Sequence, residues 1–212
     1  MTAFVTPPRR SRLPRRTALP TAAWTRLRRL SFLSGGTEKA LRDRPRAVLL
    51  DLDGTLVREL PYNRDPEAVE PMPYAREALE SLRSAGIRIG VVANQSGIGR
   101  GLLTEPEAGA VNEQVEKLLG PFDVWALCPH GPLDGCPCRK PRPGLVQEAA
   151  RRLGLHPGAC VVVGDVLGDV RAAREAGARP LLIAPRPPTT ADLEPGHWAP
   201  DLAAAARLIL GP

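Results

Sequence analysis

The sequence predicts a doubly wound α/β domain built around a parallel β-sheet. From Arg46 onward, short apolar runs alternate with amphipathic segments of about ten to fifteen residues, which is the pattern of βαβ units. The apolar runs are continuous, as expected for strands that are buried on both faces. A glycine follows each of four amphipathic segments, where a left-handed residue commonly ends a helix, at Gly86, Gly120, Gly154 and Gly177.

These patterns predict five strands and five helices. The strands cover residues 47–52, 87–93, 124–128, 160–164 and 180–184. The helices cover residues 74–85, 105–119, 143–153, 168–176 and 201–210. Pro143 stands at a first-turn position that proline tolerates, and the last helix follows a proline-rich loop and is expected at the surface.

Length and composition favour a single domain. The chain has 212 residues, of which 43% are hydrophobic, enough for one buried core but not for two full domains. No stretch of about 18 uncharged apolar residues occurs, so a membrane-spanning helix has no candidate segment. We therefore expect a soluble protein that is a monomer and has no membrane partner.

The net charge of +6 is divided unevenly along the chain. Residues 1–46 carry eleven Arg and one Lys against two acidic residues, so the remainder is mildly acidic. We interpret residues 1–45 as a basic, mostly disordered N-terminal extension and residues 46–212 as the folded domain. The extension is a dispensable or misassigned start, an arm that contacts an anionic surface, or a targeting segment. Nucleic acid is not an expected partner, apart from a weak contact by this extension.

Polar residues follow three of the expected strands. Asp51 and Asp53 close the first strand, Asn94 follows the second, and Asp165 follows the fourth, with Asp169 four residues later. Ligands of open α/β sheets bind at the carboxyl ends of the strands, so these side chains are expected to converge. As alternate residues of an extended segment, Asp51 and Asp53 should share a face. With Asp165 they suit Mg²⁺, which prefers oxygen ligands and binds substrate phosphate.

Three of the four cysteines lie in one short loop together with a histidine. The array Cys-x-His-x5-Cys-x-Cys consists of Cys128, His130, Cys136 and Cys138. Four such ligands with no open position suit a tetrahedral structural Zn²⁺. Disulfides are the alternative, but Cys160 begins a buried strand and nothing indicates an oxidising compartment. We therefore expect bound zinc and a cytoplasmic protein.

Four motifs in order resemble the haloacid dehalogenase superfamily of phosphohydrolases over residues 46–185. They are Asp51-Leu52-Asp53-Gly54-Thr55-Leu56, Lys140-Pro141, Gly164-Asp165 and Asp169. The resemblance implies a Rossmann-like fold in which Asp51 is the nucleophile and Asp53 is the acid and base. Mg²⁺ would be held by Asp51, Asp53 and Asp165, with Asp169 behind them, and Lys140 would place a positive charge over the transferring phosphate.

The cysteine loop narrows this resemblance to a branch that includes histidinol-phosphate phosphatase and heptose-bisphosphate phosphatase. In that branch the same ligand order precedes Arg-Lys-Pro, here Arg139-Lys140-Pro141. The segment 94–101, Asn-Gln-Ser-Gly-Ile-Gly-Arg-Gly, is more similar to the heptose enzymes. The resemblance implies a small phosphorylated sugar as substrate and no large cap domain. It also implies that substrate contacts come from Asn94, Gln95, Ser96, Arg100 and Arg139.

Two positions depart from the pattern of this branch. Ala93 stands where a Thr or Ser hydroxyl usually faces the phosphoryl group, and Val166 stands where the heptose enzymes have Lys. Losing one oriented donor lowers a rate by about two to three decades, which need not abolish catalysis. Three alternatives therefore stay open: a histidinol-phosphate phosphatase, a polynucleotide 3′-phosphatase, and a non-catalytic, zinc-containing binding module.

Overall fold

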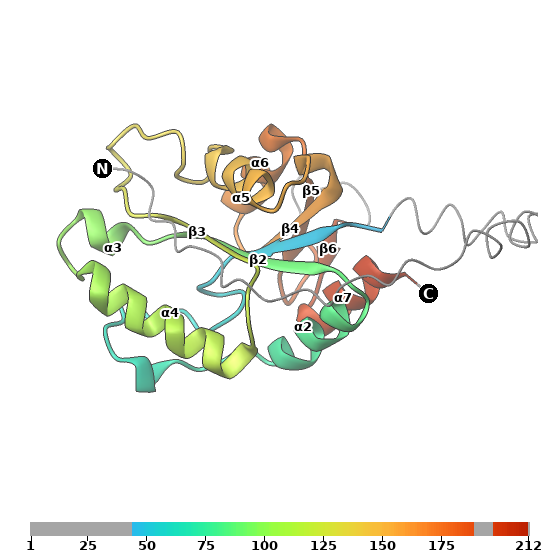
Figure 1. The fold of residues 1–212 in the computed structure, drawn as a ribbon, viewed down its shortest axis with the longest axis horizontal. Coiled ribbons are helices and arrows are strands. Elements are labelled where there is room, and N and C mark those ends of the chain that lie inside the picture. The colour runs from blue at the N-terminus through green and yellow to red at the C-terminus, as the bar shows by residue number, and fades with distance from the viewer. Residues whose placement is uncertain (1–43, 189–196, 212) are drawn as a thin grey trace, which may run out of the picture.

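The computed structural model describes residues 44–188 and 197–211, so the basic extension, with its predicted disorder, lies almost entirely outside the described residues. The described chain forms one six-stranded sheet in the order β3-β2-β1-β4-β5-β6, in which every neighbouring pair is parallel (Figure 1). The strands are β1 Ala47–Leu50, β2 Arg88–Asn94, β3 Val124–Cys128, β4 Cys160–Gly164, β5 Arg179–Ile183 and β6 Trp198–Ala199.

Helices cover both faces of this sheet (Figure 1). On one face lie α2 Ala75–Ser84, α4 Glu105–Leu119 and α7 Leu202–Leu210, and on the other α5 Gly144–Arg152 and α6 Leu167–Ala176. Short helical turns occur at η3 Pro66–Ala68, α3 Ser96–Gly99 and η4 Pro157–Ala159. The predicted doubly wound α/β fold is therefore confirmed.

The core has two layers because neighbouring strand residues face opposite sides of the sheet. Leu50 and Val91 pack with α2, α4 and α7, whereas Leu49 and Val92 pack with α5 and α6. All four side chains are fully buried, which explains why the strands read as continuous apolar runs. The four predicted helix-ending glycines all have positive φ.

The first strand ends earlier than predicted, at Leu50 instead of residue 52. The carbonyl of Leu52 accepts hydrogen bonds from the N–H groups of Leu56 and Val57, and Gly54 has a φ of 79°, so the chain turns here. Asp51 and Asp53 therefore lie just beyond the strand, where the N–H of Asp51 still donates to the carbonyl of Val163 on β4 and Asp53 forms an isolated bridge with Val57. The sequence also did not predict β6 or α3, which have only two and four residues.

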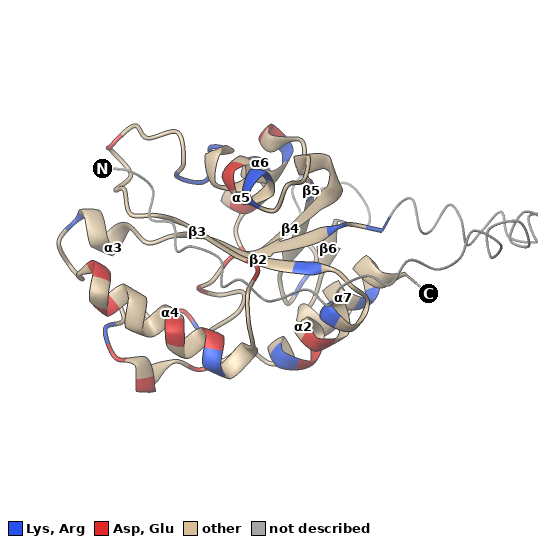
Figure 2. Cartoon of the chain, viewed as in Figure 1, with Lys and Arg blue, Asp and Glu red and all other residues tan. Residues whose placement is uncertain are grey.

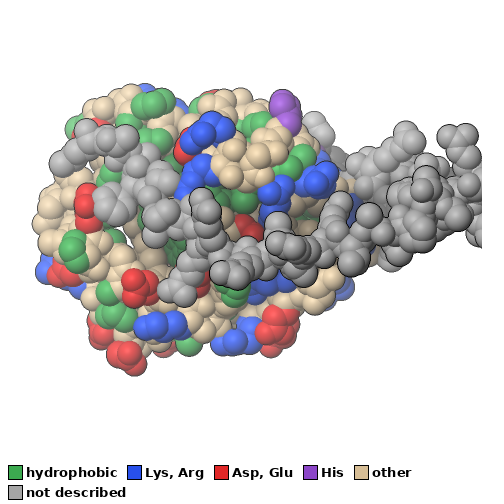
Figure 3. All heavy atoms as spheres, in the orientation of Figure 1, with side chains coloured by type: hydrophobic (Ala, Val, Ile, Leu, Met, Phe, Trp, Pro, Cys, Tyr) green, Lys and Arg blue, Asp and Glu red, His purple; other side chains and the backbone are tan. Residues whose placement is uncertain are grey.

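The segment between β1 and β2 contains no separate cap domain, as expected. All of its residues are described, and its one α-helix, α2, packs against β2 and α7. No helix within the described ranges is long and apolar enough to cross a membrane. Charged side chains of both signs lie on the face seen in Figure 3, and α4 is mainly acidic (Figure 2).

Candidate active site

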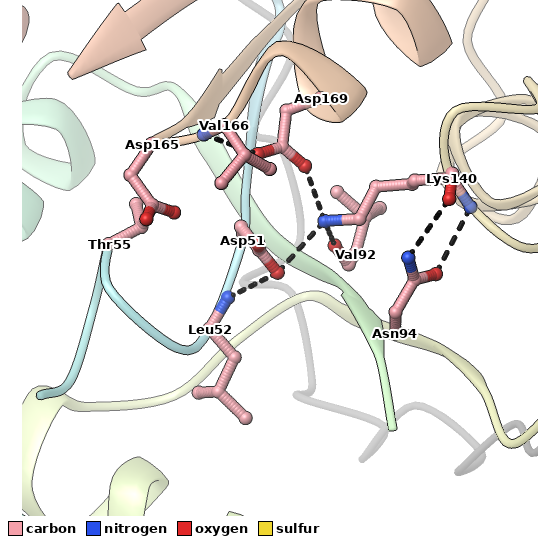
Figure 4. Close-up of polar contacts among 9 residues, drawn as sticks. All are labelled: Asp51, Leu52, Thr55, Val92, Asn94, Lys140, Asp165, Val166 and Asp169. Carbon is pink, nitrogen blue, oxygen red and sulfur yellow. Dashed lines mark hydrogen bonds and ion pairs between the residues drawn. The ribbon is translucent and has the colours of Figure 1, made fainter. Parts of the chain in front are cut away.

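Three carboxylates and one lysine meet at the carboxyl end of the sheet (Figure 4). Asp51 follows β1, Asp165 follows β4, and Asp169 lies in the first turn of α6. Carboxylate oxygens of these three residues all lie within 4.8 Å of one another. Lys140 reaches them from the loop between β3 and α5. The prediction that the strand ends bring polar side chains together is confirmed for Asp51, Asp165 and Asp169.

The Lys140 ammonium is held on three sides. Its Nζ atom lies 2.8 Å from Oδ1 of Asp51 and 2.5 Å from Oδ1 of Asp169. It also donates a hydrogen bond of 2.8 Å to the carbonyl of Val92 on β2. The side chains of Lys140 and Asp169 are only 3% and 2% exposed. A cation that is both buried and this fully coordinated is fixed in position beside Asp51.

Burial and neighbouring charges shift the pKa of this lysine in opposite directions. Burial alone would lower the pKa of Lys140, but the carboxylates of Asp51 and Asp169 more than reverse this and raise it. Lys140 is therefore a permanent cation. Burial raises the pKa of Asp169, and Lys140 opposes that rise.

Asp165 belongs to this cluster, whereas the carboxylate of Asp53, which the sequence placed among the Mg²⁺ ligands, is not part of it. Thr55 donates a hydrogen bond of 3.1 Å to Oδ1 of Asp165. Burial and the charge of Asp51 raise the pKa of Asp165. Partial withdrawal from water, followed by the charges of Asp51, Glu59 and Asp165, raises the pKa of Asp53 to about 6, although its side chain keeps an exposed surface. A carboxyl group with this pKa can both give and take a proton near neutral pH.

Two glycines make this crowding possible. A Cβ atom on Gly54 would lie 2.4 Å from Oδ2 of Asp165, and one on Gly164 would lie 2.2 Å from Oδ2 of Asp169. Both distances are too short for any side chain, so these carboxylates approach the backbone only because glycine is there. The Gly in each motif is thus explained by packing against a carboxylate.

Asn94 contacts the lysine loop. Its amide nitrogen donates to the carbonyl of Lys140, and its amide oxygen accepts from the N–H of Lys140, both at 3.1 Å. The side chain is predicted to bind substrate, and the structure additionally shows that it fixes the backbone from which the Lys140 ammonium extends.

The four predicted zinc ligands also converge. Cys138 Sγ lies 3.3 Å from both Cys128 Sγ and His130 Nδ1, and Cys128 Sγ lies 3.7 Å from Cys136 Sγ. None of the cysteines forms a disulfide. Three thiols and an imidazole nitrogen all within 4.8 Å of one another are a donor set that fits tetrahedral Zn²⁺. Cys138 stands two residues before Lys140, so this loop leads directly into the carboxylate site.

A pocket of about 220 Å³ opens beside Asp53. Asn94, Gln95 and Ser96 line it, as do residues 59–63 of the loop after the first motif. A larger hollow of about 290 Å³ lies at the opposite, amino end of the strands, away from every carboxylate of the site. Of these two pockets, the one beside Asp53 is therefore the one that adjoins the carboxylate site.

The two arginines predicted to contact substrate bind protein groups here. Arg100 donates a hydrogen bond of 2.5 Å to the hydroxyl of Tyr62, and its guanidinium lies 5.4 Å from the centre of that ring. Arg139 donates to the carbonyl of His130 at 3.1 Å. Neither arginine belongs to the pocket lining.

Comparison with known proteins agrees with this geometry. A sequence profile of the haloacid dehalogenase-like hydrolase family matches residues 58–177, more than half of the chain. The chain belongs to this family. The match includes Lys140, Asp165 and Asp169 and begins after Asp51 and Asp53. The expected family and its hydrolase chemistry are thus confirmed.

Individual members of the family are similar over most of the domain. The D-glycero-beta-D-manno-heptose-1,7-bisphosphate 7-phosphatase of Bordetella bronchiseptica is 34% identical over 141 residues, which are 64% of this chain and 79% of that protein. The alpha-anomer 7-phosphatase of Mycobacterium tuberculosis is 36% identical over 62% of this chain and 73% of its own length. A crystal structure of the B. bronchiseptica D,D-heptose 1,7-bisphosphate phosphatase, complexed with magnesium and phosphate, has a TM-score of 0.68 and 31% identity, covering 78% of this chain and 98% of that one.

The two departures from the heptose-enzyme pattern differ in their surroundings. Ala93 is buried within β2, whereas Val166 is 52% exposed beside Asp165. Three further residues at the site had no individual role predicted from the sequence. Thr55 stands in the first motif. Glu59 and Tyr62 lie in the loop 58–65, which is one of the loops expected to set selectivity, but only the tertiary structure identifies these two residues within it.

Proposed function

We propose that this protein is a Mg²⁺-dependent phosphatase that removes the 7-phosphate from D-glycero-D-manno-heptose 1,7-bisphosphate or a similar sugar bisphosphate. The observation that carries the proposal is the buried Lys140 ammonium held against Asp51, with Asp165 and Asp169 beside it. The names of the relatives support the substrate. The relatives include phosphatases for both anomers, so the proposal covers both.

In the proposed reaction Asp51 is the nucleophile and Asp53 transfers the protons. A carboxylate oxygen of Asp51 attacks phosphorus, the bond from phosphorus to the sugar oxygen breaks, and Asp53 gives its proton to that oxygen. The carboxylate of Asp53 then takes a proton from a water molecule, whose oxygen attacks phosphorus and releases phosphate from Asp51. A pKa of about 6 suits Asp53 to both steps.

Cations must offset the repulsion between Asp51 and the phosphate. Lys140 supplies one fixed charge, at 2.8 Å from Asp51. The oxygen donors of Asp51 and Asp165, with the backbone carbonyl of Asp53, are a suitable set for Mg²⁺, which when bound supplies further positive charge at the transferring phosphoryl group. Asp169 keeps Lys140 oriented through their ion pair.

The zinc loop has a supporting role in this proposal. Cys128, His130, Cys136 and Cys138 would bind Zn²⁺ and hold the segment that carries Arg139 and Lys140. The N–H of Arg139 donates to Cys136 Sγ at 3.4 Å, which couples the ligand cluster to this segment. Thiols kept for a metal, with no disulfide, are consistent with a cytoplasmic location.

The test is phosphate release by the wild type and Asp51→Asn, with Mg²⁺ and with a chelator. The substrates are both anomers of heptose 1,7-bisphosphate, histidinol phosphate and a 3′-phosphorylated oligonucleotide. We expect the wild type to release phosphate from a heptose bisphosphate only with Mg²⁺, and the mutant to release none. Turnover of another substrate alone would replace the proposed one, and no turnover by folded wild type would leave the non-catalytic alternative.

A further inference from the structure

The pocket beside Asp53 contains acidic and neutral polar groups. Its polar lining consists of Asp53, Glu59, Tyr62, Asn63, Asn94, Gln95 and Ser96. No Lys or Arg is among the described residues that line it. A pocket with two carboxylates and no cation is a poor place for a second phosphate group, because like charges repel. It is well suited to hydroxyl groups, which donate hydrogen bonds to carboxylates.

Glu59 is available for such hydrogen bonds. Its side chain is exposed, and it forms no ion pair with another described residue. The arginine next to it in sequence, Arg58, turns to Glu70 instead, at 3.0 Å. Glu59 lines the same pocket as Asp53, and its charge contributes to the raised pKa of Asp53.

The wall that carries Glu59 is tied to the loop after β2. Tyr62 receives the hydrogen bond from Arg100, and Arg64 donates to the carbonyl of Leu102. A Cβ atom on Gly97 would lie 2.8 Å from the Tyr62 ring, so the two segments are in close contact. These contacts join the loop after the first motif to the loop after β2, and they engage the side chains of Arg64 and Arg100, neither of which lines the pocket.

We propose that this pocket receives the uncharged, hydroxyl-bearing part of the substrate and that Glu59 is a specificity-determining residue that accepts hydrogen bonds from those hydroxyls. The second phosphate of a bisphosphate then lies outside the pocket. This assignment rests on the proposed function, because it places the sugar part of a sugar phosphate in the pocket beside Asp53.

The test is the selectivity of Glu59→Gln. We measure the ratio of kcat/KM for heptose 1,7-bisphosphate to kcat/KM for p-nitrophenyl phosphate, which has no sugar hydroxyls. Losing one hydrogen bond to a charged group should lower this ratio about tenfold, mainly by raising the KM for the sugar substrate. Glu67→Gln is the matched control, since Glu67 is an exposed glutamate on η3 outside the pocket, and its ratio should stay unchanged.

Two results would overturn the inference. An unchanged ratio in Glu59→Gln would show that Glu59 does not contact the sugar. An equal loss on both substrates, with a shifted pH profile, would show that Glu59 acts only through the proton of Asp53.

A binding measurement separates this inference from the proposed function. Calorimetry on Asp51→Asn, with and without Glu59→Gln, needs no turnover. About tenfold weaker binding of the heptose bisphosphate to the double variant supports the inference even if the wild type hydrolyses nothing. Equal binding, or no binding to either protein, contradicts it.

Discussion

Replacing Lys140 with Met should strongly destabilise the protein. Met keeps most of the buried side-chain volume but removes the ammonium that contacts both Asp51 and Asp169. Asp169 is only 2% exposed, so its charge would remain buried without the lysine, with the N–H of Val166 at 3.3 Å still donating to it. Removing one partner of a buried ion pair typically lowers the free energy of unfolding by about 3–5 kcal/mol. The hydrogen bond from Lys140 to the carbonyl of Val92 would also be lost.

The effect of Lys140→Met should depend on pH. The pKa of Asp169 is already raised above its usual 3.8 in the native protein, and Lys140 opposes that rise. Without Lys140 the pKa of Asp169 in the native protein rises further. Asp169 then ionises at a lower pH in the unfolded protein than in the native one. The variant therefore loses stability as the pH increases from the unfolded-state pKa of Asp169 to its native-state pKa. The difference in stability between variant and wild type should therefore be larger at pH 7 than at pH 5.

Urea unfolding at both pH values, without added Mg²⁺, measures these differences. Arg58→Met is the control, because the Arg58–Glu70 pair is 66% and 70% exposed and should contribute less than about 1 kcal/mol. Adding Asp169→Asn to Lys140→Met should recover part of the loss, since it removes the unpaired anion. A loss below about 1 kcal/mol at pH 7, or no recovery in the double variant, would refute the reasoning.

Two further predictions concern the glycines and the zinc loop. Gly164→Ala should lower the free energy of unfolding by about 1–3 kcal/mol, because its Cβ would overlap Asp169. Gly109→Ala in the open interior of α4 should raise it by about 0.5–1 kcal/mol, and urea unfolding of both variants checks the contrast. Cys138→Ser should lower the zinc content, the unfolding temperature and phosphatase activity together. Elemental analysis with thermal unfolding measures this, and wild-type protein purified without zinc but fully stable would contradict it.

Much of the fold was predictable because its signals are local. Continuous apolar runs gave the strands of a sheet covered on both faces, and the boundaries of β3, β4 and α4 are confirmed without change. Gly86, Gly120, Gly154 and Gly177 end helices as predicted, since only glycine takes positive φ without strain. β6 was missed because two residues carry no detectable period.

The site was predictable to the extent that its residues stand at strand ends or in one short loop. Asp51 and Asp165 converge as expected, because parallel strands bring their carboxyl ends to one edge of the sheet. The four zinc ligands converge separately, because they belong to one short loop. The early end of β1 was not foreseen, since it depends on hydrogen bonds from Leu56 and Val57 back to Leu52.

By itself, the sequence determined the fold class, the carboxylate and lysine set, and the cysteine–histidine array. Only the tertiary structure decided that Asn94 holds the backbone of Lys140, that Arg100 lies on Tyr62, and that Glu59 faces the pocket beside Asp53. Patterns of burial and turn geometry repeat along the chain and can be read from neighbouring residues. The partner of an arginine or an amide lies tens of residues away, and its identity depends on how two loops meet once the sheet has formed.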